Sequence, residues 1–161
     1  MATTSSTYYY EVDIYTDASS QPSPGPSGIA VRIVDPKSGR ILFEEAGYIG
    51  QTTSNRAEYT AIIFALDKAR GITCRKANLI SDNMLAVKQI EKIFKVQSPA
   101  LNPLFLKARN LIDNYYKEGV SVKHLSEAGV IPSFDYRHHQ YCDQRAKNAA
   151  NNRSPILKVN I

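Results

Sequence analysis

The chain has little that would hold it in a membrane or cross-link it outside the cell. Of its 161 residues 43% are hydrophobic, yet no apolar run approaches the length that spans a bilayer. Residues 1–7 lack the apolar core of a signal peptide. The two cysteines, Cys74 and Cys142, lie far apart without metal-ligand spacing, which predicts reduced thiols. We therefore expect a soluble, cytoplasmic protein with no membrane contact.

The chain carries a moderate excess of positive charge. Lysine and arginine number 20 against 15 acidic residues, a formal net charge of +5. This bias suits a polyanionic partner, but many small basic proteins bind nothing anionic, so it indicates little alone. The length predicts a single domain over residues 1–161, with a frayed start at 1–7 and a short tail at 153–161.

The first third of the chain has the periodicity of strands. Residues 8–16 (YYYEVDIYT) alternate in the two-residue pattern of a strand, and the Pro- and Gly-rich segment 19–28 predicts a turn. Further strands are expected over 28–34 and 40–49, joined by a hairpin turn at 35–39. Three consecutive antiparallel strands are the natural result.

The rest of the chain alternates helical and strand patterns. Helices are expected over 56–70, 83–94, about 101–115 and 139–152, and strands over 77–81 and 120–125. The predicted fold class is α/β, with a five-stranded mixed sheet of three antiparallel and then two parallel strands, flanked by helices.

Four acidic residues lie beside apolar residues and not on evidently solvated faces: Asp17, Glu58, Asp82 and Asp143. Asp17 and Asp82 are predicted to end strands, and the other two to lie in the first turns of helices. Singly, each has an ordinary explanation as a turn or cap residue, or as a partner of a helix dipole. Together at the carboxyl ends of neighbouring strands they would repel one another without a cation. Two Mg²⁺ ions about 4 Å apart would neutralise them and suit phosphoryl displacement.

The segments around these acids carry a family resemblance. IYTDASSQPSPGPSG, GYIGQTTSNRAEYTAIIFAL, LISDNMLAVKQI and QYCDQRAKNAA are similar, in this order, to the four acid-bearing segments of type 1 ribonucleases H. The resemblance runs from about residue 8 to 152, and four ordered motifs are specific where one would be weak. The chain is identified on these residues as resembling the prokaryotic type without a basic handle.

The resemblance implies a ribonuclease H-like fold and an endonuclease that hydrolyses the RNA strand of RNA–DNA hybrids, leaving 5′-phosphate and 3′-hydroxyl ends. It implies Asp17, Glu58, Asp82 and Asp143 as catalytic residues and ligands of two Mg²⁺ ions, with Mn²⁺ as a possible substitute. Asp17 would bridge both metals, Asp143 would help hold the metal that activates water, and the other two acids would serve the leaving oxygen. A monomer without an obligate protein partner is expected.

Candidate substrate contacts surround the first two acids. They are Ala18, Ser19, Ser23, Thr53, Ser54, Asn55 and Gln89. Ala18 stands where the family usually has glycine, and Ser23 and Ser54 stand where it often has asparagine. Thr53 and Asn55 could equally cap the following helix, because caps and phosphate contacts use the same side-chain chemistry.

The family often has a histidine before the last acid, thought to assist water activation or product release. His124 follows the predicted fifth strand in the family-like position and is slightly favoured, while His138 and His139 lie closer in sequence to Asp143. The connection 93–104 is short and the chain has no tryptophan, so no Trp-rich basic handle is present. Substrate grip would then depend on dispersed cations such as Lys88, Lys92, Lys95 and Arg145.

Three alternatives stay open. The chain could be a module that grips hybrid or duplex without cutting it, although the presence of all four acids argues against this. It could be another nuclease of the same fold, such as a junction resolvase or an integrase-like enzyme, but TTSNRAE beside the Pro-Gly-Pro loop favours ribonuclease H. It could also be a piece of a reverse transcriptase polyprotein, against which Met1 and the length argue mildly.

Overall fold

A computed structural model describes residues 8–73 and 75–161, so the prediction for the thiol of Cys74 lies outside the described residues. Five strands form one sheet in the order β3-β2-β1-β4-β5. They are β1 (Glu11–Ser20), β2 (Gly25–Val34), β3 (Ile41–Thr52), β4 (Lys76–Ser81) and β5 (Val120–His124). β1, β2 and β3 pair antiparallel, and β4 pairs parallel with β1 and β5, which confirms the predicted mixed sheet.

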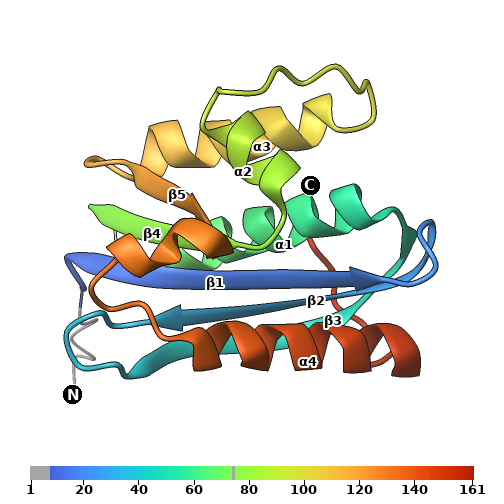
Figure 1. The fold of residues 1–161 in the computed structure, drawn as a ribbon, viewed down its shortest axis with the longest axis horizontal. Coiled ribbons are helices and arrows are strands. Elements are labelled where there is room, and N and C mark those ends of the chain that lie inside the picture. The colour runs from blue at the N-terminus through green and yellow to red at the C-terminus, as the bar shows by residue number, and fades with distance from the viewer. Residues whose placement is uncertain (1–7, 74) are drawn as a thin grey trace, which may run out of the picture.

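Helices cover both faces of this sheet (Figure 1). They are α1 (Ser54–Ala69), α2 (Met84–Ile90), α3 (Asn102–Tyr115), the 3₁₀ helix η1 (Leu125–Val130) and α4 (Tyr136–Asn152). α1 packs on β1 and β2 with α3 behind it, whereas α4 lies across β1, β2 and β3 on the opposite face. Within 8–73 and 75–161, no helix combines the length and apolar character needed to cross a membrane.

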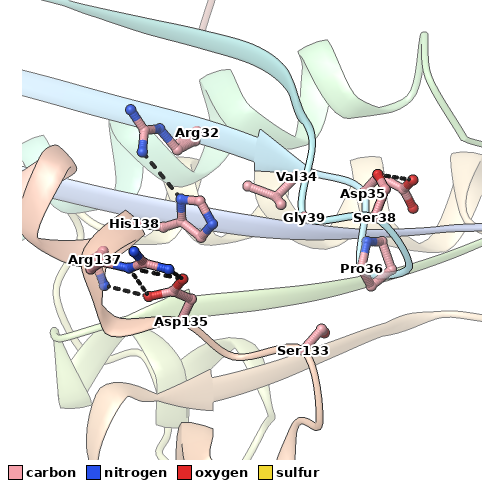
Figure 2. Close-up of a pocket in the computed structure, with 10 residues that line it drawn as sticks. All are labelled: Arg32, Val34, Asp35, Pro36, Ser38, Gly39, Ser133, Asp135, Arg137 and His138. Carbon is pink, nitrogen blue, oxygen red and sulfur yellow. Dashed lines mark hydrogen bonds and ion pairs between the residues drawn. The ribbon is translucent and has the colours of Figure 1, made fainter.

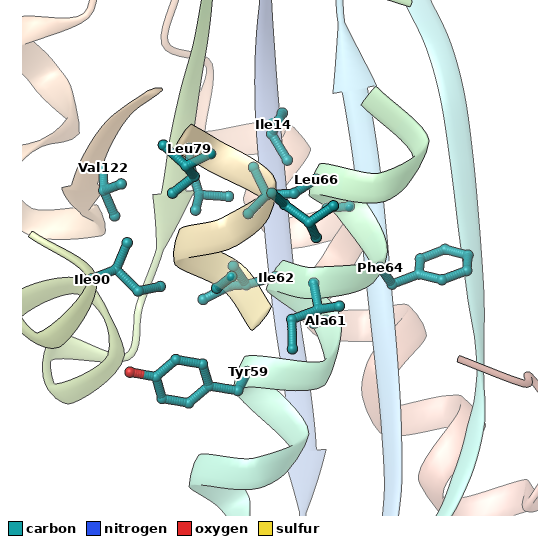
Figure 3. Packing of buried hydrophobic residues seen from close by; sticks show 14 of the residues in the cluster. Ile14, Tyr59, Ala61, Ile62, Phe64, Leu66, Leu79, Ile90 and Val122 are labelled. Carbon is teal, nitrogen blue, oxygen red and sulfur yellow. The ribbon is translucent and has the colours of Figure 1, made fainter. Parts of the chain in front are cut away.

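Each face of the sheet has its own apolar core. Ile14 and Leu79 pack with Leu66 of α1 on one face (Figure 3), while Tyr15 packs with Cys142 of α4 on the other. Successive residues of β1 thus alternate between the two cores, as a strand requires. On the second face α4 approaches β2 so closely that a Cβ on Gly28 would lie 2.4 Å from the carbonyl oxygen of Ala146. Only glycine fits there, and it fixes α4 against the sheet.

Several predicted boundaries are wrong by a few residues. β1 extends to Ser20 because its pairing with β2 continues as far as Ser20 opposite Ser27. The turn is therefore confined to residues 21–24, within the predicted segment 19–28. α1 begins at Ser54, not at residue 56, and α4 begins at Tyr136, not at 139. α2 ends at Ile90, four residues before its predicted end. Because α1 and α4 begin earlier than predicted, Glu58 and Asp143 lie further along their helices.

Candidate active site

The four acidic residues line one cavity of about 350 Å³ at the carboxyl end of β4. Asp17 comes from β1, Asp82 follows β4 directly, Glu58 comes from α1 and Asp143 from α4. The two helices lie on opposite faces of the sheet, so the acids converge from both faces and from the sheet itself. The remaining lining residues are Ala18, Ser19, Ser20, Gln21, Ser54, Asn83 and Lys147.

Asp17 does not end its strand as predicted. The parallel pairing between β1 and β4 stops at Tyr15 opposite Ile80, whereas the pairing of β1 with β2 continues to Ser20. Asp17 therefore lies just beyond the end of β4, where one edge of β1 is open. The short partner strand creates the site edge, in keeping with the rule that α/β sites form beyond strand carboxyl ends.

The ordinary explanations for the other acids do not hold in the structure. The first turns of α1 and α4 contain no acidic residue, so Glu58 and Asp143 lie too far along their helices to complement the helix dipoles. The N-cap of α2 is Asn83, whose side chain accepts a hydrogen bond from the amide of Ala86 at 2.9 Å. Asp82 is therefore not needed as a cap, and its carboxylate is left to face the cavity.

Burial and mutual repulsion make two of these carboxylates unfavourable as anions. Asp17 is 3% exposed, and burial followed by the charge of Asp82 raises its pKa to about 8, against a single opposing hydrogen bond from the amide of Ala18. Burial, with the charges of Asp17 and Asp82, also raises the pKa of Glu58, which accepts one hydrogen bond from Ser81 at 3.0 Å. Such a site is stabilised by an added cation.

The residues present fit a hard divalent metal. Among the described residues that line the cavity the cationic side chain is Lys147, whose Nζ lies 3.0 Å from Oδ2 of Asp143 and which is half exposed. One ammonium leaves most of the carboxylate charge uncompensated. Carboxylate oxygens are the donors that Mg²⁺ and Mn²⁺ prefer.

The structure does not bring all four acids equally close together. One ligand atom of each of Asp17, Asp82 and His139 lies within 4.8 Å of the other two. Within 8–73 and 75–161 this is the group of three that meets that spacing, and neither Glu58 nor Asp143 belongs to it. These two acids line the same cavity, where they bind Ser81 and Lys147.

The three histidines have three different environments. The Nδ1 of His124 accepts from the amide of Ser126 at 3.1 Å, which leaves Nε2 as the N–H that faces the main-chain oxygen of Asp82 at 3.0 Å. His138 lies in a separate cavity of about 490 Å³ with its Nδ1 3.1 Å from a guanidinium nitrogen of Arg32 (Figure 2). His139 is buried with its Nε2 3.8 Å from Oδ2 of Asp82.

His139 is thus the histidine nearest a carboxylate of the cavity, although sequence reasoning slightly favoured His124. A signal was available in the sequence, because residues four apart lie on one face of a helix and His139 precedes Asp143 by that interval. The predicted helix over 139–152 already contains both residues at this interval, so the shared face could have been found from the sequence.

Of the predicted substrate residues, Ala18, Ser19 and Ser54 line the cavity, and the other four are not among its lining residues. Thr53 caps α1 by accepting from the amide of Arg56 at 3.3 Å, and the amide of Ser54 donates to Ser23 Oγ at 2.9 Å. Gln89 is instead buried at 3% exposure and accepts a hydrogen bond from Tyr59 at 2.6 Å. Its side-chain oxygen stabilises the contact between α1 and α2.

Asn55 and Asn83 join the two helices at the cavity. The side chain of Asn83 donates to Oδ1 of Asn55 at 3.1 Å while it caps α2. Asn83 lines the cavity, yet sequence reasoning did not single it out. Its neighbour Asp82 drew attention because of its charge, and the amide gave no comparable signal.

Comparison with known proteins gives this arrangement a family. Residues 15–129 match the family described as reverse transcriptase-like. The bifunctional protein Rv2228c of Mycobacterium tuberculosis is 31% identical over 105 residues, which are 65% of this chain and 29% of that protein. Ribonuclease HI of Halobacterium salinarum is 31% identical over 117 residues, 73% of this chain and 57% of that protein. The chain thus spans less than two thirds of the length of these relatives.

Solved structures agree with the sequence relatives. The N-terminal RNase H domain of Rv2228c, solved as a fusion with maltose binding protein, superposes with a TM-score of 0.76 at 26% identity, covering 89% of this chain and 95% of that one. LC11-RNase H1 in complex with RNA/DNA hybrid gives 0.74 at 28% identity, covering 88% and 98%. The strand order, the helices on both faces and the matched sequence lead to one conclusion: the chain belongs to the ribonuclease H family.

Proposed function

We propose that the chain is an endoribonuclease that hydrolyses the RNA strand of RNA–DNA hybrids and leaves 5′-phosphate and 3′-hydroxyl ends. The observation that carries this proposal is the convergence of four acidic side chains on one cavity, two of them buried with raised pKa values. The hybrid bound to the similar LC11-RNase H1 supports the choice of substrate. The 2′-hydroxyl groups of the RNA strand would distinguish it from the DNA strand.

Asp17, Glu58, Asp82 and Asp143 would hold the metal ions in this mechanism. When bound, two Mg²⁺ ions would offset the carboxylate charge, activate the attacking water and stabilise the leaving oxygen. The charges of Asp82 and Asp143 both raise the pKa of Asp17, so Asp17 would gain from a cation that these acids hold together. Ser81 orients Glu58 through its hydrogen bond.

The rim of the cavity would position the substrate. Ser19 and Ser54 present polar groups beside the acids, and the amide of Ala18 donates to Asp17 Oδ1 at 2.8 Å. Asn55 accepts a hydrogen bond from Asn83, which lines the cavity. Thr53 and Ser23 fix the start of α1, so their contribution to substrate binding would include holding this rim in place. Binding through dispersed lysines would weaken as salt rises. The monomeric state, the single domain and the cytoplasmic location stay predictions.

A cleavage assay across a metal series tests the proposal. A labelled RNA–DNA hybrid, double-stranded RNA and branched DNA are incubated with the protein in Mg²⁺, in Mn²⁺ and in chelator, and the product ends are mapped. We expect metal-dependent cleavage of the RNA strand of the hybrid alone. Binding without cleavage in either metal would favour a hybrid-gripping module, and preferred cleavage of branched DNA would favour a resolvase-like nuclease.

A further inference from the structure

His139 is a buried polar side chain beside Asp82, one of the acids of the cavity. It is 6% exposed on α4, and its ring packs 5.7 Å from that of Tyr136, centroid to centroid. Within the described part of the chain its ring has no hydrogen-bond partner, and Nε2 approaches Oδ2 of Asp82 only to 3.8 Å. An imidazole nitrogen at that distance is too far away for a direct hydrogen bond to the carboxylate.

The spacing of the group suits a shared ion. The ligand atoms of Asp17, Asp82 and His139 all lie within 4.8 Å of one another. Ligands about 2.1 Å from an octahedral ion are separated by about 3 Å when adjacent and about 4.2 Å when opposite. A decrease of up to about 2 Å in these separations would place all three donor atoms on one ion.

The donor set also has a chemical preference. Two carboxylates alone favour hard ions such as Mg²⁺, whereas an imidazole nitrogen adds affinity for transition metals, among which Mn²⁺ also accepts oxygen ligands. We propose that His139 supplies a nitrogen ligand to a divalent metal held by Asp17 and Asp82, and that it shifts this site from Mg²⁺ toward Mn²⁺. The inference rests on the proposed metal-dependent nuclease site, but its test measures coordination and not cleavage.

The test compares wild type, His139→Asn and the matched control His138→Asn, whose side chain lies in the separate cavity with Arg32. Electron spin-echo spectroscopy of the Mn²⁺-loaded proteins reports nitrogen bound directly to the metal, and calorimetry gives the affinities for Mn²⁺ and Mg²⁺. We expect nitrogen coupling in wild type and His138→Asn and its loss in His139→Asn. Mn²⁺ affinity should fall about tenfold or more in His139→Asn, and Mg²⁺ affinity by less than about threefold.

Two results would overturn the inference. One is the absence of nitrogen coupling in the wild-type spectrum, and the other is an equal loss of affinity for both metals in His139→Asn, as expected if the ring only supports Asp82. Should His139→Asn fail to fold, wild-type protein with ¹⁵N-labelled histidine replaces it, because a coordinated ring changes the coupling from ¹⁴N to ¹⁵N. Nitrogen coordination without hybrid cleavage would leave this inference intact and refute the proposed nuclease activity.

Discussion

Two buried aspartates of β1 show opposite solutions to the same physical problem. Asp13 and Asp17 lie four residues apart on the same side of the strand, and they are 0% and 3% exposed. Asp13 accepts hydrogen bonds from Asn78 at 2.9 Å and from Ser133 at 2.5 Å. Asp17 has one donor, the amide of Ala18, and its charged neighbours include Asp82 and Asp143.

The difference separates a structural carboxylate from a functional one. Burial raises the pKa of both groups, but the donors from Ser133 and Asn78 counteract the rise at Asp13, whereas further acids increase it at Asp17. At the first position the protein stabilises the charge with its own side chains. At the second a bound cation would stabilise the charge, as the proposed metal site requires.

The largest contrast is expected in catalysis. Asp17→Asn should lower the rate of hybrid cleavage by about 10³-fold or more, because a bound metal supplies several kcal/mol of transition-state stabilisation. Asn78→Ala, which alters the surroundings of Asp13, should keep the rate within about threefold. Steady-state cleavage in Mg²⁺ and in Mn²⁺ measures both. Comparable rates for Asp17→Asn and wild type would contradict the assignment of this site.

A large difference is also expected in the pH dependence of stability. A raised pKa in the folded state means that the stabilising contribution of the Asp17 carboxyl is complete below about pH 4 and is lost as pH rises to about 8. Metal-free wild type should therefore lose stability over that window relative to Asp17→Asn, by several kcal/mol, since one pKa unit corresponds to about 1.4 kcal/mol. Denaturant titrations from pH 4 to 9 measure this loss, and added Mg²⁺ should restore stability to wild type alone.

Changing the surroundings of Asp13 should cause a smaller loss of stability, and Mg²⁺ should not reverse it. Asn78→Ala removes a donor from a buried carboxylate and should destabilise the protein by about 1.5–3 kcal/mol at neutral pH. Mg²⁺ should not recover this loss, because Asp13 lies outside the acidic cavity. Urea unfolding with and without the metal distinguishes the two aspartates. A loss that Mg²⁺ reverses in Asn78→Ala would mean that the two positions are coupled.

This contrast also explains how far the sequence could predict the site. The sheet, its mixed pairing and the order of the helices follow from local periodicity, which the sequence displays directly. The open edge at Asp17 does not follow from local periodicity. It depends on the pairing between β1 and β4, which stops at Tyr15 opposite Ile80 and is set by the partner strand. The donors to Asp13 come from Asn78 and Ser133, which are far from it in sequence. The sequence therefore does not show that side-chain donors satisfy Asp13 and that Asp17 lacks such donors among the described residues.

Helix starts were the other obstacle. TTSN offers several consecutive cap residues, and the structure uses Thr53. For α4 the cap is Asp135, whose side chain accepts a hydrogen bond from the amide of Arg137 at 3.0 Å. Asp135 lies outside the predicted helix over 139–152. The predicted start is two residues late for α1 and three residues late for α4, and this makes Glu58 and Asp143 look like partners of the helix dipoles.

The smallest effect should come from Lys147, the cationic side chain among the described residues that line the cavity. Lys147 holds Asp143 at 3.0 Å and therefore competes with a metal for that carboxylate. Lys147→Met should tighten Mg²⁺ binding roughly two- to fivefold, a modest gain because the pair is half exposed and screened by solvent. Lys88→Met is the matched control, since Lys88 pairs with Glu127 outside the cavity and should leave the affinity unchanged. Calorimetry at low salt measures both variants. Weaker Mg²⁺ binding in Lys147→Met would mean that the lysine orients Asp143 for the metal, so that a protein cation would assist the acidic site as Asn78 assists Asp13.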